Sequence, residues 1–175
     1  MRKVIKLPDR LKAIADCIDK YAAVADIGTD HGYLPVYLAQ TGIARRIIGV
    51  DVSSGSLESA RRNAAKYDVA ERIELLHAQG LDPIGQSDVD TVVIAGVGGE
   101  TILGILTEAL WTVEAAKSGR LKLILQPQTK LDVLCKFLHD KGYIIKETIN
   151  VLDRGRTYTI LEVGQPQGIA GRNPQ

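Results

Sequence analysis

The chain has 175 residues, 45% hydrophobic and 25% charged, which is the composition of one globular domain and excludes a disordered or fibrous chain. Lys and Arg number 22 against 21 Asp and Glu, so any surface that binds a polyanion has to be a local patch. The two cysteines fit neither a metal-ligand spacing nor a disulfide framework, and no apolar stretch approaches the roughly 20 residues of a membrane span. We therefore expect one cytoplasmic domain without a metal or a membrane partner.

Short apolar runs alternate with helix-periodic segments, which is typical of a parallel sheet with crossover helices. The sequence predicts, in chain order, a helix over 11–18, a strand over 22–26, a helix over 33–40, a strand over 46–50, a helix from Ser53 or Ser54 to about Tyr67, strands over 73–77 and 91–95, one long helix over 102–113, a strand over 121–125 and a helix over 131–138.

Beyond residue 142 the pattern changes. Residues 143–150 and 157–163 are β-rich and surround Asp153-Arg154-Gly155, a hairpin turn in which the glycine supplies a positive φ. We expect an α/β fold with a doubly wound, mostly parallel sheet that ends in an antiparallel hairpin. Residues 1–163 form the domain, and residues 164–175, rich in Gly, Pro and Gln, form a loose tail.

The most informative stretch is the turn from Asp26 to Gly32, which follows the first predicted strand. Ligands of open α/β sheets bind at the carboxyl ends of the strands, and glycines such as Gly28 allow close backbone approach. Asp30 stands where a dinucleotide fingerprint has its second glycine. A carboxylate about 4 Å from a phosphate would weaken the binding of a dinucleotide by roughly 1–4 kcal/mol. The turn therefore favours S-adenosylmethionine (SAM), which carries ammonium and sulfonium cations; a bare structural turn is the alternative.

The next two strand ends suit a nucleoside. Asp51 follows the second strand at the interval typical of a carboxylate that binds ribose hydroxyls. Alternatively, it leads the next helix and favours the helix dipole. Gln79, after the third strand, has an amide that can bind the exocyclic amine of adenine, although loop glutamines are usually solvated.

The last two parallel strands end in glycines and amides. Gly96, Gly98 and Gly99 indicate either the floor of a substrate pocket or a very tight strand–helix junction. Pro127 restricts Gln126 to extended conformations, so its amide can be presented rigidly; a plain turn before a helix explains the same residues.

Together these motifs resemble class I SAM-dependent methyltransferases and, more narrowly, the bacterial tRNA adenine-N1-methyltransferases of the TrmK type, which modify adenine 22. The resemblance spans about residues 7–163 and rests on Arg10-Leu11, ADIGTDHGYLP at 25–35, IAGVGG at 94–99, LILQP at 123–127 and Tyr158. The chain departs from the family pattern at Gln79, Gln128 and Thr159, where the family has aspartate, asparagine and glutamate. The family's C-terminal coiled-coil domain, thought to help hold tRNA, has no counterpart among the predicted elements.

The resemblance implies a Rossmann-like methyltransferase sheet and assigns site residues by position. Asp30 and His31 are the implied catalytic residues. The implied SAM-binding residues are Asp26, Gly28, Thr29, Asp30, Gly32, Tyr33, Asp51, Val52, Gln79, Gly80, Leu81, Ala95 and Gly96. The implied substrate-binding residues are Arg10, Gly98, Gly99, Gln126, Pro127 and Tyr158.

The implied reaction is in-line methyl transfer to N1 of an adenine in tRNA. Neutral adenine N1 has a free lone pair, so the rate arises mainly from alignment, and the base has to leave its pair to expose N1. We expect Asp30 and His31 to line the pocket, Gly98 and Gly99 to let the base approach, and Gln126 to read its edge. Three alternatives stay open: a methyltransferase for another substrate, a nicotinamide-dependent oxidoreductase, and a module that binds RNA or a partner without turnover.

Overall fold

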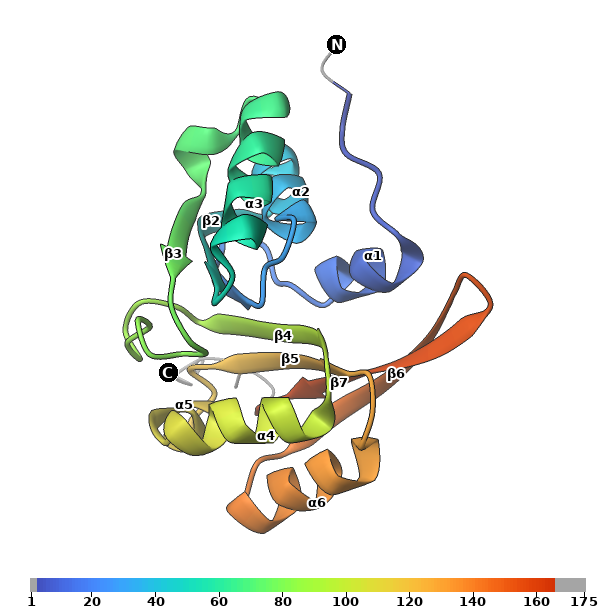
Figure 1. The fold of residues 1–175 in the computed structure, drawn as a ribbon. Coiled ribbons are helices and arrows are strands. Elements are labelled where there is room, and N and C mark those ends of the chain that lie inside the picture. Colours follow the sequence, from blue (N-terminus) through green and yellow to red (C-terminus); the bar gives the residue numbers. More distant parts are fainter. Residues whose placement is uncertain (1–2, 166–175) are drawn as a thin grey trace, which may run out of the picture.

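The computed structural model describes residues 3–165, which fold around one seven-stranded sheet in the order β3-β2-β1-β4-β5-β7-β6 (Figure 1). Strands β1 to β5 pair in parallel, whereas β7 pairs antiparallel with both β5 and β6. The predicted doubly wound sheet with a terminal antiparallel hairpin is confirmed. The expected tail falls mainly on residues 166–175, which lie outside the described residues.

The elements follow one another in the alternation that the sequence predicts. They are α1 (Asp9–Asp16), β1 (Ala22–Ile27), α2 (Tyr33–Thr41), β2 (Ala44–Asp51), α3 (Ser54–Lys66), the 3-10 helix η1 (Ala70–Arg72), β3 (Glu74–His77), β4 (Thr91–Val97), α4 (Gly99–Glu108), α5 (Trp111–Lys117), β5 (Lys122–Pro127), α6 (Leu131–Lys141), β6 (Ile145–Asp153) and β7 (Arg156–Val163).

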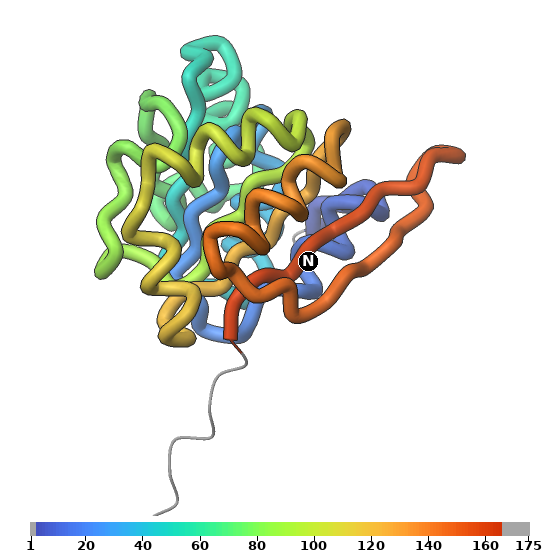
Figure 2. The backbone as a smooth tube through the Cα atoms, turned by 90° about the horizontal axis from the view of Figure 1, so that it is seen from below, coloured from blue at the N-terminus to red at the C-terminus, as the bar shows by residue number. Residues whose placement is uncertain are grey.

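Helices cover both faces of the sheet. In Figure 1, α1, α2 and α3 lie on one face and α4, α5 and α6 on the other, and Figure 2 shows the second group in front of the strands. Each face has its own apolar core, with Ile14 and Leu38 fully buried in the first and Ile102 and Leu134 in the second. Because β1 lies between these layers, all six of its residues are buried, as expected for a central parallel strand.

The strand order indicates where a ligand would bind. From β1 the chain builds outward to β2 and β3 on one side, and β4 begins the other side. In open α/β sheets, the space outside the carboxyl ends of the strands at this reversal is where ligands bind. The turns after β1 and β4 therefore meet at the edge where the sequence predicts the site.

The last two strands form a long hairpin. Arg154 and Gly155 make its two-residue turn with φ of 50° and 76°, the positive values that match the twist of the flanking strands. The hairpin projects past the carboxyl ends of β4 and β5 (Figures 1 and 2). Its tip is fastened to α1, because the backbone N–H of Arg10 donates to Asp153 Oδ2 at 3.2 Å.

The prediction of one long helix over 102–113 is wrong, because the segment divides into α4 and α5. Ala109 leaves the helical region with φ −114° and ψ 64°, and Thr112 binds the freed Ala109 carbonyl through its N–H and its hydroxyl, at 3.0 and 2.7 Å. Val113 still packs against the same core, so the apolar stripe continues across the break. The hydrophobic pattern therefore does not reveal it.

Within residues 3–165, no helix is long and apolar enough to cross a membrane. The same part of the chain contains no group of three or more His, Cys, Asp or Glu side chains that could hold a metal ion.

Candidate functional site

The turn after β1 opens toward the crevice. The N–H groups of Gly28 and Thr29 both donate to the Val50 carbonyl, at 2.8 and 3.0 Å, which fixes this turn against the end of β2. Gly28 has φ +74°, and a Cβ built on it would meet no atom within 4 Å. Its glycine is thus required by the backbone conformation, and the space in front of it is free for a ligand.

Asp26 is a buried carboxylate at the base of this turn, with 7% of its surface exposed. Burial raises its pKa to about 6, the Thr29 hydroxyl that donates to Oδ2 at 2.8 Å opposes the rise, and the nearby charge of Asp51 adds to it. Weaker effects come from Arg10, which lowers the pKa, and from Asp30, which raises it. A cation placed here would stabilise the ionised form, so the group is suited to a positively charged ligand.

Asp51 ties the turn to the start of α3. Its Oδ2 accepts from the backbone N–H of Asp30 at 2.9 Å, and its Oδ1 accepts from the N–H of Ser53 at 2.9 Å. Ser53 in turn caps α3 by accepting from the N–H of Ser56, as the sequence predicts for this helix. Each oxygen retains a further lone pair, so the carboxylate can hold the turn and still accept from ribose hydroxyls.

Asp30 and His31 lie at the rim of the turn, and both are largely exposed. The His31 ring contacts Ser59 Oγ through Nδ1 at 2.8 Å, and its Nε2 lies 3.7 Å from Asp30 Oδ2. Asn63 donates to the His31 carbonyl at 2.8 Å. Ser59 and Asn63 were not among the predicted site residues; their i, i+4 spacing on one face of α3 is the signal that could have found them.

The remaining predicted cofactor residues lie at or beyond the carboxyl ends of β1 to β4 and differ in exposure. Val52, Gln79 and Gly96 are exposed, Tyr33 is 39% exposed with its ring 5.4 Å from that of His31, Gly80 and Ala95 are half-buried, and Leu81 is buried in the core. His77 Nε2 contacts the Val52 carbonyl at 2.9 Å and thereby joins the ends of β2 and β3.

Gln126 is the centre of a second cluster, on the side of β4 and β5. It is fully buried, and its Oε1 accepts from the N–H of Gly96 at 3.1 Å and from Arg10 Nη1 at 2.8 Å. Its Nε2 donates to the Pro127 carbonyl at 3.0 Å. The Arg10 guanidinium lies 5.7 Å from the centre of the Tyr158 ring. The structure thus brings together five residues of the predicted substrate and cofactor sets, and both ends of the Gln126 amide are used within the protein.

The glycines after β4 pack against the loop that precedes α6. A Cβ on Gly99 would lie 2.5 Å from the Lys130 carbonyl oxygen, and one on Gly98 would lie 3.1 Å from Thr129 Oγ1. The Gly99 N–H also donates to the Thr129 carbonyl at 2.8 Å. The close approach at Gly99 is therefore one of the chain to itself, the tight junction that the sequence left as an alternative; contact of either glycine with a substrate stays a prediction.

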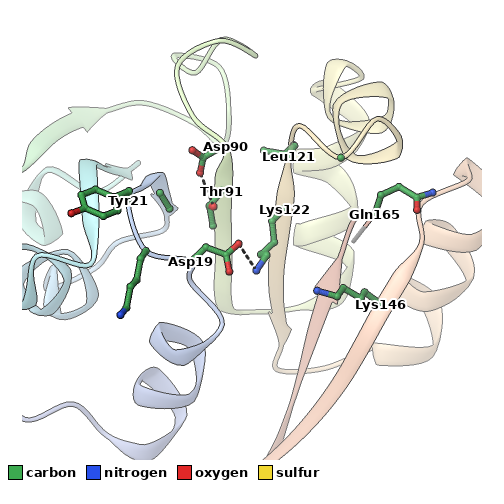
Figure 3. Close-up of a pocket in the computed structure, with 11 residues that line it drawn as sticks. Asp19, Tyr21, Asp90, Thr91, Leu121, Lys122, Lys146 and Gln165 are labelled. Atoms are coloured by element: carbon green, nitrogen blue, oxygen red, sulfur yellow. Dashed lines mark hydrogen bonds and ion pairs between the residues drawn. The ribbon is translucent and has the colours of Figure 1, made fainter. Parts of the chain in front are cut away.

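A different cavity, of about 250 Å³, lies at the opposite, amino-terminal edge of the strands (Figure 3). Most of its charges are paired: Lys122 Nζ lies 2.9 Å from Asp19 and 3.1 Å from Glu162, and Asp90 lies 3.3 Å from Arg45. None of the predicted site residues lines it. We therefore assign these ion pairs to the stability of the sheet edge.

Comparison with known proteins agrees with this geometry. A family model described as "Methyltransferase domain" matches residues 7–161. The chain is 32% identical to the tRNA (adenine(22)-N(1))-methyltransferase of Bacillus subtilis over 160 residues, which are 90% of this chain and 64% of that enzyme. The chain thus spans less than two thirds of the length of this relative.

Two solved structures extend the likeness to the fold. The B. subtilis m1A22 tRNA methyltransferase TrmK matches with a TM-score of 0.84 and 29% identity, over 94% of this chain and 68% of that one. Sp1610 of Streptococcus pneumoniae, solved in complex with S-adenosyl-L-methionine, matches with a TM-score of 0.83 and 32% identity, over 91% and 73% of the two chains. The chain therefore belongs to the methyltransferase-domain family and, within it, to the TrmK-like group of class I methyltransferases.

Proposed function

We propose that this chain transfers the methyl group of SAM to N1 of adenine 22 in tRNA. The observation that carries the proposal is the open turn after β1, which is bordered by the carboxylates of Asp26, Asp30 and Asp51. Such a turn opposes a diphosphate and favours a cationic ligand. The relatives described above, one of them solved with SAM, support the same cofactor.

The residues of the first cluster fit this cofactor. Asp26 offers a buried carboxylate for a cationic group, and Asp51 retains acceptor capacity for ribose hydroxyls. Gly28 leaves room for close approach of the ligand to the backbone. When bound, SAM would supply an activated methyl group; the chain's part is to fix its position and to exclude water.

The second cluster faces the acceptor side. Arg10 and Tyr158 are the residues of this cluster that could contact the target base, which would lie beyond β4 and β5 with its N1 toward the turn after β1. Gln126 is fully buried and its amide is already bonded, so the expectation that it reads the edge of the base is wrong, and its part is to position Arg10. Because neutral N1 has a free lone pair, the site needs alignment more than a strong base. N1 takes part in Watson–Crick pairing, so the adenine has to be unpaired or flipped. Asp30 and His31, at the rim of the turn, would orient the base, and the Asp30 carboxylate would stabilise the positive charge that the adenine gains on methylation.

The direct test is incubation of the protein with methyl-labelled SAM and unmodified bacterial tRNA, followed by nucleoside analysis. We expect label in 1-methyladenosine, and none when a transcript has guanosine at position 22. Label in another nucleoside, a protein or a small molecule would keep the enzyme class and reject the substrate. SAM binding without turnover would indicate a binding module, and NADH binding in a fluorescence titration would overturn the cofactor.

A further inference from the structure

A small cavity adjoins the acceptor side of the site. Pro127 and Tyr158, which line it, belong to the predicted substrate-binding set, whereas its two basic residues, Lys130 and Arg156, have no role assigned above. The cavity measures about 180 Å³ and is lined by the loop from Pro127 to Leu131 on one side and by the start of β7 on the other. Pro127 directly follows Gln126, the centre of the second cluster. Tyr158 lines the cavity and also lies beside Arg10, so the cavity adjoins the second cluster.

The cavity is positively charged. Lys130 and Arg156 line it from its two walls, and no aspartate or glutamate lines it. Within residues 3–165, neither of these side chains forms an ion pair, whereas Lys122 in the cavity of Figure 3 is paired with Asp19 and Glu162. Two unpaired cations that face one small space favour an anion there.

The Arg156 side chain and the Lys130 backbone have defined contacts. The Arg156 guanidinium lies 5.7 Å from the centre of the Tyr158 ring, and Arg10 lies at the same distance from that ring, so Tyr158 connects the cavity to the second cluster. Lys130 has φ +57°, a conformation that L residues rarely adopt, and its carbonyl packs closely against Gly99. The backbone of the loop that lines the cavity is thereby packed against the start of α4.

The cavity is too small for a complete ligand. Pockets that bind small molecules measure about 300–1,000 Å³, so a space of this size would take one group of a larger substrate. An arginine fork beside a lysine matches the oxygens of a phosphate. When a base is flipped out, the phosphodiesters on either side of it stay close to the mouth of its pocket.

We propose that Lys130 and Arg156 bind the phosphodiester of a nucleotide that flanks the target adenine. This inference rests on the proposed function, because it names the part of the RNA that this site holds. Phosphate contacts position a nucleic acid without reading its sequence. The subsite would therefore set the register of the flipped adenine while the second cluster contacts the base.

The test compares Lys130→Gln and Arg156→Gln with the wild-type chain for binding of an unmodified tRNA transcript, measured by filter binding over a range of salt concentrations. Each variant should raise Kd for tRNA about tenfold at low salt, the effect of one lost charge-assisted contact. Each should also lower the slope of log Kd against log salt concentration by about 0.7 to 0.9. Kd for SAM should stay unchanged, which also confirms that each variant is folded.

Matched controls are Lys20→Gln and Arg120→Gln, which remove exposed charges at the opposite edge of the sheet and should leave both quantities unchanged. Arg156→Lys should restore the salt slope, because it retains the charge. Wild-type values in both Gln variants, or equal effects in the controls, would overturn the subsite, as would a wild-type chain that binds no tRNA at low salt. A wild-type chain that binds tRNA without methylating it would reject the proposed reaction, and the Kd values would still decide the subsite.

Discussion

Asp26 should make the affinity for SAM fall below neutral pH. Burial, opposed by the Thr29 hydrogen bond, raises its pKa to about 6. Only the ionised carboxylate attracts a cationic ligand, so binding weakens as the pH falls through this value. If the protonated form does not bind, lowering the pH from about 7 to about 5 reduces the affinity about tenfold, which is about 1.4 kcal/mol.

Calorimetric titration of the protein with SAM across this pH range measures the effect, and Asp26→Asn is the matched variant. It retains the side-chain shape but has no charge to lose, so its weaker affinity should be independent of pH. A wild-type Kd that stays constant between about pH 5 and 7, or an equal pH dependence in Asp26→Asn, would refute the assignment of Asp26 to the cationic ligand.

The same pKa has the opposite consequence for the stability of the ligand-free protein. The folded-state pKa lies above the unfolded value of 3.8, so the folded chain binds this proton more tightly. The contribution of Asp26 to the free energy of unfolding therefore falls as the pH rises from about 4 to about 6, by about 3 kcal/mol at most. In urea denaturation, the difference in the free energy of unfolding between the wild type and Asp26→Asn should change by this amount between the two pH values, because all other groups titrate in both proteins.

Three further predictions concern the rest of the site. Gly99→Ala should lower the free energy of unfolding by about 1–3 kcal/mol in urea denaturation, because its Cβ would lie 2.5 Å from a backbone oxygen. Gly104→Ala is the control in the same helix; its Cβ would meet no atom within 4 Å, so it should not lower the free energy of unfolding. Equal effects of the two substitutions would contradict the tight junction. Gln126→Leu should lower the free energy of unfolding by about 1–3 kcal/mol in the same measurement, because it leaves the Gly96 N–H and the Arg10 guanidinium without their acceptor. A variant as stable as the wild type would show that water replaces the amide. His31→Ala should reduce the rate of methyl transfer in the tRNA assay and leave Kd for SAM nearly unchanged; an undiminished rate would remove His31 from the reaction.

The fold could be predicted largely from local signals. The alternation of apolar runs with helix-periodic segments and the glycine turn at Gly155 are properties of neighbouring residues, and they predicted the parallel sheet and its hairpin. The break between α4 and α5 could not be predicted, because Val113 continues the apolar stripe. The position of β7 between β5 and β6 depends on pairing between distant segments, which no local pattern contains.

In the site, too, some residues could be predicted from local patterns and others could not. The residues near Asp26 could be found because they follow one strand in a recognisable turn. The partners of Gln126 could not, since Arg10 lies 116 residues away in the sequence. Asp153 was predicted only as a turn residue, yet its carboxylate accepts from the Arg10 N–H and fastens the hairpin to α1. Such contacts between distant segments can be identified only in the three-dimensional structure.

The contact between Arg10 and Asp153 also bears on the order in which the protein is assembled. The two residues are separated by 143 positions, whereas Asp26 and Asp51 come from neighbouring βα units. Contacts between distant residues bear a larger loop-closure entropy and tend to form late. In a chain emerging from the ribosome, the turn that holds Asp26 and Asp51 is thus complete long before the contact between Arg10 and Asp153, which are separated by 143 positions.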